Sequence, residues 1–299
     1  MLSHGALCRL AAEKARDADY NPEVKKRILR YGAPVGSSLA HYHQLPRCMD
    51  LLRRRVRDNT APSPATGQVI RADRLTGSSG RFSRSWHAPV GGLYLALLWA
   101  DTLLPDFSRQ LPFAAGIACC ESVREFIPAA HLQWVNDVRI EGRKICGILS
   151  ETVSATDGEQ FHLIGIGINV NTRKFLLKLE PTATSLYLTT GKEVDLDGFC
   201  ALLLARLQWN FGLLYYSEEQ FLAGDRAGNH RDKSPLLQRW QELSDTLGRI
   251  VTYGYDVQTK PLYQARVIDI DAAGGLVMQL PDGSKITEYS GEISYDTDV

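Results

Sequence analysis

Three polar side chains in the middle of the chain have the types and spacing that an anionic ligand needs. Asn136 and Asp137 close the segment QWVND, and Lys144 follows seven residues after Asp137. The intervening Glu141-Gly142 pair suits a two-residue hairpin turn, and groups near such a turn lie close in space. An amide, a carboxylate and an ammonium could therefore converge. The alternative is a solvent-facing lysine, although an ammonium entering an apolar strand costs free energy unless it is paired.

A loop rich in glycine and serine, residues 76–85, lies upstream of these residues. Gly77 and Gly80 allow backbone N–H groups to approach a ligand, and Arg81 and Arg84 offer guanidinium groups to a phosphate or a carboxylate. No GK[ST] ends the loop and no helix follows it, which excludes a P-loop and a dinucleotide fingerprint. Taken alone, it is more simply a flexible surface loop.

A third feature is the pair of glycines Gly165 and Gly167 in the strand-like segment GIGINVN, with Asn169 beyond them. Glycines inside a strand mark a place where another group approaches the backbone closely. A strand bulge is the alternative, and no helix follows that would make the segment a dinucleotide-binding loop.

Apolar periodicity and turn signals predict an α+β fold with a mixed, largely antiparallel sheet and flanking helices. Expected strands are 37–45, 68–73, 93–99, 131–140, 143–153 and 160–171, and expected helices are 47–58, 111–127 and 195–217. From about Trp240, four short strand segments separated by Asp/Gly turns predict a small β-barrel. We expect a helix and linker over 1–36, a catalytic domain over 37–235 and the barrel over 236–299.

Composition limits the kinds of partner. Thirty-four basic residues balance thirty-four acidic ones, which gives no overall field for nucleic acid or a membrane surface. The longest apolar run, 90–104, contains Asp101 and is too short to span a membrane, and the first twenty residues lack the pattern of a secretion signal. Six cysteines without metal-ligand spacing predict reduced core thiols. We therefore expect a cytoplasmic protein that binds neither nucleic acid nor a membrane.

Five segments in one chain order resemble the biotin protein ligases, in the monofunctional form without a DNA-binding domain. The segments, which correspond to motifs of that family, are SSGRFSRSW (78–86), QWVND (133–137), GRKICGIL (142–149), GIGINV (165–170) and ATSL (183–186). The ending at 239–295 is similar to the family's C-terminal barrel of the Src-homology-3 type, so the resemblance spans roughly 37–295.

The resemblance implies an ATP- and Mg²⁺-dependent reaction in two steps. Biotin is activated as biotinyl-5′-AMP and then transferred to a lysine of the biotin-carrier domain of a carboxylase. It implies that Lys144 and Arg81 are catalytic, and that Ser79, Gly80, Arg81, Lys144 and Gly147 bind biotin. The implied ATP ligands are Arg81, Arg84, Trp86, Asn136, Asp137 and Asn169. The implied metal ligands are Asp137 and Asn169. Relatives are often dimers through a sheet edge, which makes a homodimer a further expectation.

The chain departs from the family pattern on the biotin and phosphate side. Ser78 and Ser83 stand where the loop carries glycines, Ser79 replaces an arginine, and Phe82 takes a frequently basic position. Further departures are Leu75, Gln133, Val135 and the Arg47-Cys48 pair, which stands where a Ser-Thr pair contacts the biotin ring. These changes predict weaker biotin affinity or a leakier adenylate. They leave open another acid, such as lipoate or octanoate, and a degenerate binding or regulatory homologue.

Overall fold

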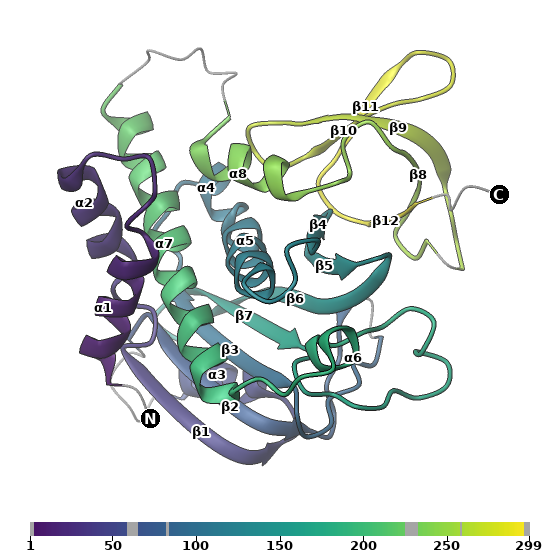
Figure 1. Cartoon of the computed structure of the whole chain (residues 1–299). Coiled ribbons are helices and arrows are strands. Elements are labelled where there is room, and N and C mark those ends of the chain that lie inside the picture. The colour runs from purple at the N-terminus through teal and green to yellow at the C-terminus, as the bar shows by residue number, and fades with distance from the viewer. Residues whose placement is uncertain (1–2, 59–64, 82–83, 225–232, 258, 296–299) are drawn as a thin grey trace.

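The computed structural model describes residues 3–58, 65–81, 84–224, 233–257 and 259–295. A seven-stranded sheet in the order β1-β2-β3-β7-β6-β5-β4 forms its centre (Figure 1). The strands are β1 (Ser38–Leu45), β2 (Gln68–Leu75), β3 (Leu93–Ala100), β4 (His131–Gln133), β5 (Asp137–Ile140), β6 (Arg143–Ser154) and β7 (Gln160–Ile168). The pair β1/β2 is parallel and the other neighbours are antiparallel. The expected α+β fold with a mixed sheet is confirmed.

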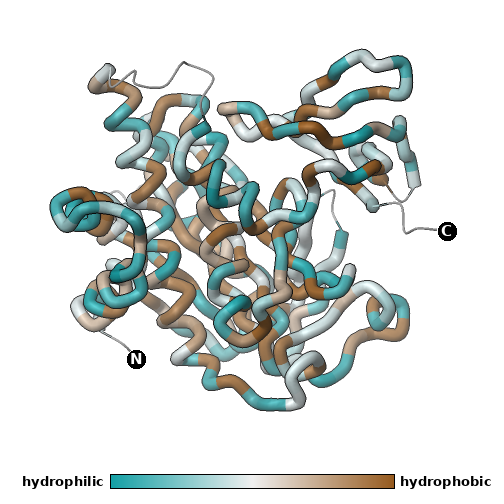
Figure 2. Tube along the Cα trace, turned by 45° about the horizontal axis from the view of Figure 1, so that its top comes forward, coloured by the Kyte–Doolittle hydropathy of each residue, from teal (hydrophilic) through white to brown (hydrophobic). Residues whose placement is uncertain are grey.

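Helices cover both faces of this sheet. The helices α5 (Leu111–Arg124) and α7 (Leu196–Leu222) cover one face, and α3 (Cys48–Arg57) covers the other. Shorter helices are α4 (Pro105–Ser108), α6 (Leu186–Thr190) and α8 (Pro235–Leu243). Figure 2 shows hydrophobic residues running along the central helices, with hydrophilic residues on the outer turns. The two apolar faces of the sheet therefore have separate cores.

The N-terminal segment differs from the expected helix and linker, because it forms two helices, α1 (His4–Lys14) and α2 (Pro22–Gly32). Asn21-Pro22 is the beginning of α2: the Asn21 side chain accepts a hydrogen bond from the Val24 N–H, and proline fits the first helical turn. A Cβ on Gly32 would lie 1.7 Å from the Gln208 carbonyl oxygen, so glycine is what allows α2 to pack closely on α7. The segment belongs to the packed core.

The expectation of a single strand over 131–140 is wrong, because this segment forms two strands, β4 and β5. The chain turns at residues 134–136, so that β4 and β5 pair with each other and Gln133 faces Asp137. Contacts with the C-terminal sheet hold this turn: Gln133 Nε2 donates to the Ile293 carbonyl at 2.9 Å, and the Trp134 indole N–H donates to the Gly274 carbonyl at 3.3 Å.

The C-terminal region is a five-stranded antiparallel sheet in the order β11-β10-β9-β8-β12. Its strands are β8 (Ile250–Gly254), β9 (Tyr263–Ile270), β10 (Leu276–Gln279), β11 (Lys285–Glu288) and β12 (Glu292–Tyr295). The last expected strand segment, 285–295, is divided at Gly291, whose φ of +105° favours glycine. The small antiparallel sheet is therefore present, and its closure into a barrel stays a prediction.

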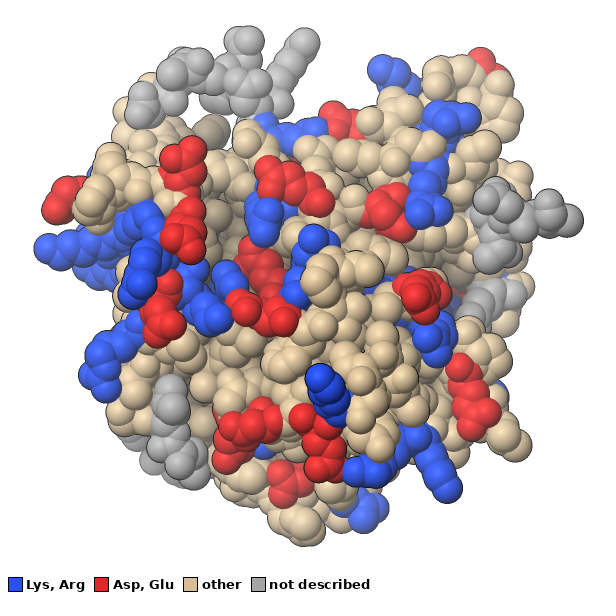
Figure 3. Space-filling model, viewed as in Figure 1, with Lys and Arg blue, Asp and Glu red and all other residues tan. Residues whose placement is uncertain are grey.

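Three further expectations concern the cysteines, the distribution of charge and membrane-spanning helices. All six cysteines are free thiols and all but Cys8 are buried. On the face drawn in Figure 3, acidic and basic side chains are interspersed over most of the surface. Within the described ranges, no helix is both long and apolar enough to cross a membrane.

Candidate active site

Two glycines that face each other on neighbouring strands form the floor of the candidate site. Gly147 of β6 pairs with Gly167 of β7. A Cβ on Gly167 would lie 2.8 Å from Trp86 Nε1, and one on Gly147 would lie 3.1 Å from both Trp86 Cζ3 and Lys144 Cε. These positions have no side chain, and the indole and the lysine therefore lie directly on the sheet.

Lys144 and Asp137 meet on this floor. Lys144 Nζ lies 2.6 Å from Asp137 Oδ1, and the ammonium is 5.5 Å from the centre of the Trp86 ring, within cation–π range. The hairpin between them turns at Glu141 and Gly142, which both have positive φ, as a type I′ turn requires. The expected convergence of carboxylate and ammonium is confirmed at the level of geometry.

The backbone on both sides of Lys144 is fixed by the segment that contains ATSL. The Lys144 N–H donates to the Thr182 carbonyl at 2.8 Å, and the Thr184 N–H donates to the Lys144 carbonyl at 3.0 Å. Ser185 then caps α6 by accepting from the Leu188 N–H. The lysine is thus held from two sides, although its side chain keeps 31% exposure and remains accessible to a ligand.

The serine-rich loop folds back on itself as a narrow hairpin next to Trp86. Ser79 bridges to Ser85, and the Gly80 N–H donates to the Arg84 carbonyl at 2.6 Å. The Ser78 hydroxyl donates to the Trp86 carbonyl at 2.6 Å. Phe82 and Ser83 lie outside the described residues. The loop borders an open cavity of about 620 Å³ that reaches Trp86 and Pro89.

The two loop arginines have different surroundings. Arg84 is ion-paired at 2.5 Å with Asp256 and at 2.8 Å with Glu292, both in the C-terminal region. Burial lowers the pKa of the Arg81 guanidinium, and the nearby carboxylates of Glu292 and Asp137 act in the opposite direction. Both arginines are therefore near Glu292; Arg81 is influenced by Asp137 as well, whereas Arg84 also binds Asp256 and links the loop to the C-terminal region.

The side chains of the two candidate asparagines donate hydrogen bonds to backbone carbonyl groups. Asn136 donates from its side chain to the Ile148 carbonyl of β6. Asn169 is 2% exposed and donates from Nδ2 to the Thr184 carbonyl at 3.0 Å, while its Oδ1 is buried without a hydrogen bond. Trp86 Nε1 is likewise buried without an acceptor. Such orphan polar atoms are rare and are typical of sites completed by a ligand or water.

The expected metal ligands do not form a metal site by themselves. Asp137 Oδ1 is bound to Lys144, and the Asn169 amide binds the Thr184 carbonyl. Among the described residues, no group of three His, Cys, Asp or Glu side chains could hold a metal ion. The donor set therefore does not fit a resident metal.

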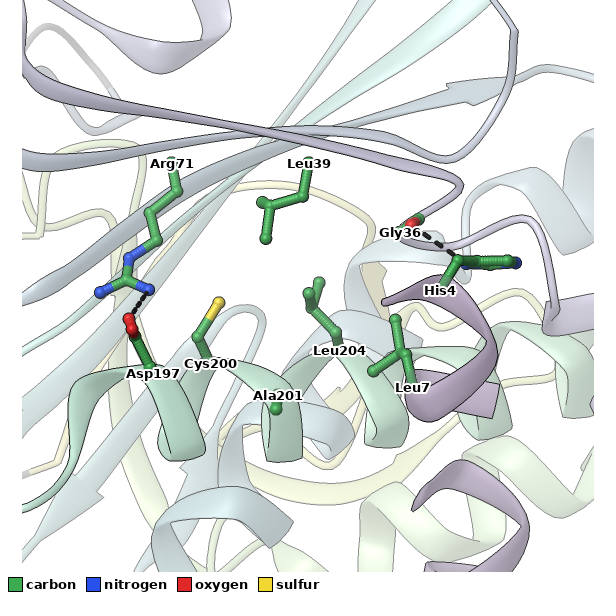
Figure 4. Close-up of a pocket in the computed structure, with 9 residues that line it drawn as sticks. All are labelled: His4, Leu7, Gly36, Leu39, Arg71, Asp197, Cys200, Ala201 and Leu204. Atoms are coloured by element: carbon green, nitrogen blue, oxygen red, sulfur yellow. Dashed lines mark hydrogen bonds and ion pairs between the residues drawn. The ribbon is translucent and has the colours of Figure 1, made fainter. Parts of the chain in front are cut away.

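A second cavity lies on the opposite face of the sheet, between α1, α7 and the strands β1 and β2. Figure 4 shows Arg71 reaching Asp197 at 2.5 Å along one side of it, and His4 bonded to the Gly36 carbonyl. Its volume of about 40 Å³ is suited to a few water molecules rather than to an acid with a nucleotide. The larger of these two cavities is therefore the one beside Trp86.

Comparison with known proteins finds similarity over the part of the chain that contains these residues. Residues 53–171 match the model of the biotin/lipoate A/B protein ligase family. The bifunctional ligase/repressor BirA of Bacillus subtilis is 33% identical over 185 residues, which are 59% of this chain and 55% of the relative. The biotin–[acetyl-CoA-carboxylase] ligase of Paracoccus denitrificans is 26% identical over 234 residues, 76% of this chain and 90% of the relative.

Among solved structures, the biotin protein ligase from Aquifex aeolicus in complex with biotin and ATP superposes with a TM-score of 0.66. It is 25% identical, over 86% of this chain and 97% of that one. The match to the biotin/lipoate A/B protein ligase family covers less than half of the chain, and over that part the chain is similar to this family. Within that family its similarity is to the biotin protein ligases. The match spans about half the length of the first curated relatives.

Two site features had no signal in the sequence. Asp256 and Glu292 approach the loop from positions 172 and 208 residues away from Arg84, a separation that local pattern cannot bridge. The glycine floor was visible only as isolated glycines, because the register that places Gly147 opposite Gly167 is a property of the folded sheet. The segments GRKICGIL and GIGINV lie in the expected strands, β6 and β7, whereas QWVND runs from the end of β4 through a turn into β5.

Proposed function

We propose that this protein is an ATP-dependent biotin protein ligase. It activates biotin as biotinyl-5′-AMP and transfers the biotinyl group to a lysine of a carboxylase biotin-carrier domain. The observation that carries the proposal is the Lys144 ammonium, 2.6 Å from Asp137, resting on the Gly147 floor beside Trp86. The similarity of residues 53–171 to the family and the likeness to a solved structure with biotin and ATP support it.

The first step joins the acid to the nucleotide. A carboxylate oxygen of biotin attacks the α-phosphorus of ATP, an O–P bond forms, and the bond to the departing pyrophosphate breaks. Negative charge increases on the phosphate oxygens in the transition state, where a positioned cation is most effective. Lys144 bridges the carboxylate and the α-phosphate, and Arg81 binds the phosphates. Asp137, the partner of Lys144, has a side chain that is only 19% exposed, and this burial holds its carboxylate in a fixed position.

The second step transfers the acyl group. The amine of the acceptor lysine attacks the carbonyl carbon of the mixed anhydride, an amide bond forms, AMP leaves and the amine loses a proton. Water would hydrolyse the anhydride, so the adenylate has to be covered until the acceptor arrives. The loop with Ser79, Gly80 and Arg84, together with Trp86, covers it; Asn136 and Asn169 hold the strands that form its walls.

The proposal extends to parts of the molecule beyond the site. ATP enters as its magnesium complex, and the charge stabilisation described above comes from the chain's own cations. The C-terminal sheet closes as a barrel of the Src-homology-3 type, with a domain boundary near residue 236. The protein acts in the cytoplasm, with a homodimer as its assembled state.

Acid-dependent ATP–pyrophosphate exchange tests the proposed function. Purified protein is compared with biotin, lipoate, octanoate and no acid, and exchange with biotin is expected. Lys144→Ala should reduce the exchange rate by about a hundredfold or more, the usual loss for a group that stabilises transition-state charge. Arg143→Ala is the matched control, because Arg143 lies beside it but pairs with Glu141 at the hairpin.

The outcomes separate the alternatives. Exchange with another acid alone would keep the mechanism and change the substrate. Absence of exchange with every acid, in folded protein, would make the chain a binding or regulatory homologue. Equal rates for Lys144→Ala and the unmodified protein would refute the assignment of Lys144.

A further inference from the structure

A second cation lies beside the Lys144–Asp137 pair, on the strand that carries Asp137. Alternate residues of a strand share a face, so Arg139 lies on the same face of β5 as Asp137. The register places Arg139 directly opposite Lys144, and Asp137 directly opposite Gly147. Side chains that face each other on antiparallel strands are close enough to interact, and like charges in these positions repel. An arginine that faces a lysine therefore needs a carboxylate between them.

Asp137 provides this carboxylate to both cations. Its Oδ1 is 2.6 Å from Lys144 Nζ, and its Oδ2 is 3.7 Å from Arg139 Nη2. Each of the three side chains is less than one-third exposed, so water and salt screen their charges less than those of an open surface pair. On its other side, Asp137 faces the neutral Gln133 of β4. The second positive charge beside Asp137 therefore comes from its own strand.

The sharing of one carboxylate by two cations changes what the lysine can do. A lysine paired one-to-one with an aspartate has no net charge, and the carboxylate holds the whole of its ammonium. Two cations around one carboxylate have a net positive charge, and their mutual repulsion loosens the hold on each of them. The Lys144 ammonium can then turn towards another anion without leaving Asp137 as an unpaired, largely buried charge, which would be costly.

The backbone of the hairpin holds Arg139 in place. Its Nη1 donates to the Gly142 carbonyl at 2.7 Å, within the turn that separates Asp137 from Lys144. This hydrogen bond does not involve the lysine. The guanidinium is therefore anchored independently of Lys144, and it stays beside Asp137 when the ammonium moves.

We propose that Arg139 is a positioning residue: it shares Asp137 with Lys144 and so frees the ammonium to bridge the acid carboxylate and the α-phosphate. The inference rests on the proposed function and adds a residue to the same site. Arg139 acts through Asp137 and contacts neither substrate. As negative charge increases on the phosphate in the transition state, Lys144 moves towards it and Arg139 neutralises the carboxylate that the ammonium leaves.

A purely structural contact within the hairpin is the competing explanation, because Arg139 also bonds to Gly142. Arg143 is the matched control. Its guanidinium is 3.5 Å from Glu141 on the same turn, and in the described part of the chain it forms no ion pair with Asp137. Arg139→Met and Arg143→Met thus remove the same group from the same hairpin, but only the first removes a charge that faces Asp137.

The test is a double-mutant cycle with Asp137→Asn, in which kcat and KM for ATP are measured by pyrophosphate exchange with biotin. Arg139→Met should lower kcat about tenfold and keep KM for ATP within about twofold, because Asp137 then holds the whole ammonium. In the Asp137→Asn background the same substitution should change kcat by less than about twofold, because no carboxylate remains to be shared. A structural role would lower kcat equally in both backgrounds.

Two further variants control this cycle. Arg139→Lys keeps the charge and should restore kcat to within about threefold of the unmodified protein. Arg143→Met should change kcat by less than about twofold, because its ion pair is at the surface of the turn. Thermal unfolding of all variants checks that they are equally folded.

Acylation of Lys144 by acetic anhydride, followed by mass spectrometry, needs no enzymatic activity. Lys144 should react about threefold more slowly in Arg139→Met, because Asp137 then holds the ammonium more tightly. If the folded protein activates no acid, the proposed function fails, and slower acylation would still support the sharing of Asp137. If exchange occurs but Arg139→Met lowers kcat equally in both backgrounds, leaves kcat unchanged or leaves acylation unchanged, the proposed function stands and the role of Arg139 is overturned.

Discussion

Arg84 Nη1 lies 2.8 Å from Glu292 Oε1, which joins the serine-rich loop to a strand 208 residues further along the chain. Asp256 binds the same guanidinium at 2.5 Å. Two carboxylates therefore occupy the cation that the family resemblance assigns to phosphate. An incoming nucleotide has to replace at least one of them or bind beside them. The C-terminal region thus contributes two carboxylates to the charge distribution of the site.

Replacement of Glu292 by glutamine tests this relationship. Glu292→Gln removes one negative charge beside Arg84 and Arg81, so repulsion of the phosphates decreases and we expect KM for ATP to fall about threefold. The measurement is pyrophosphate exchange as a function of ATP concentration. Glu288→Gln is the control, because Glu288 belongs to the same sheet but binds Tyr263. A higher KM for Glu292→Gln would mean instead that the ion pair builds the nucleotide site.

Asp137→Asn tests the partner of the proposed catalytic lysine. The variant keeps the size of the side chain but removes the charge that lies 2.6 Å from Lys144 Nζ. We expect kcat to fall tenfold to a hundredfold, because the ammonium loses its fixed position, with little change in KM for ATP. Single-turnover formation of biotinyl-5′-AMP measures this. The proposed positioning role would be refuted by a variant with unchanged kcat.

The part of this site that could be predicted is local in sequence. Glu141-Gly142 forms a hairpin turn from its residue types alone, and the turn brings Asp137 and Lys144 together. The strands 38–45, 68–75 and 93–100 follow from short apolar or alternating runs. Each of these features is determined by interactions within about ten residues, which periodicity and turn chemistry describe.

The errors have a common physical cause in contacts between distant residues. The segment 131–140 alternates like one strand, but Trp134 and Gln133 bond to the C-terminal sheet and the chain turns between them and Asp137. The beginning of α2 at Asn21-Pro22 is a local signal, but its packing depends on the approach of Gly32 to Gln208 on α7. No local pattern contains the partner in either case.

Ser79→Arg restores the cation that the family loop carries at this position. Ser79 lies at the base of the loop hairpin, bridged to Ser85, where a longer side chain can extend into the open cavity. A charged hydrogen bond to the adenylate should slow its dissociation about tenfold, equivalent to about 1.4 kcal/mol. Release of labelled adenylate after rapid dilution measures the rate. An unchanged rate would mean that the loss of the arginine is compensated elsewhere.

The pH dependence of stability tests the contact that joins α8 to the C-terminal sheet. Burial tends to raise the pKa of Asp269, but hydrogen bonds from Lys233, the Ile270 N–H and Gln241, with the Lys233 charge, lower it below its ordinary value. A carboxyl whose pKa is lowered by folding stabilises the protein above its unfolded pKa of about 3.9, and this contribution is lost as the pH falls through the folded pKa. Asp269→Asn should therefore lower Tm at pH 6, and the difference from the unmodified protein should shrink as the pH falls below the unfolded pKa and vanish once Asp269 is protonated in the folded protein. Asp282→Asn is the control, because the pKa of Asp282 is also lowered, but by Ser284 within an exposed turn. A difference in Tm for Asp269→Asn that persists at low pH would show that the effect comes from packing rather than from the charge of Asp269.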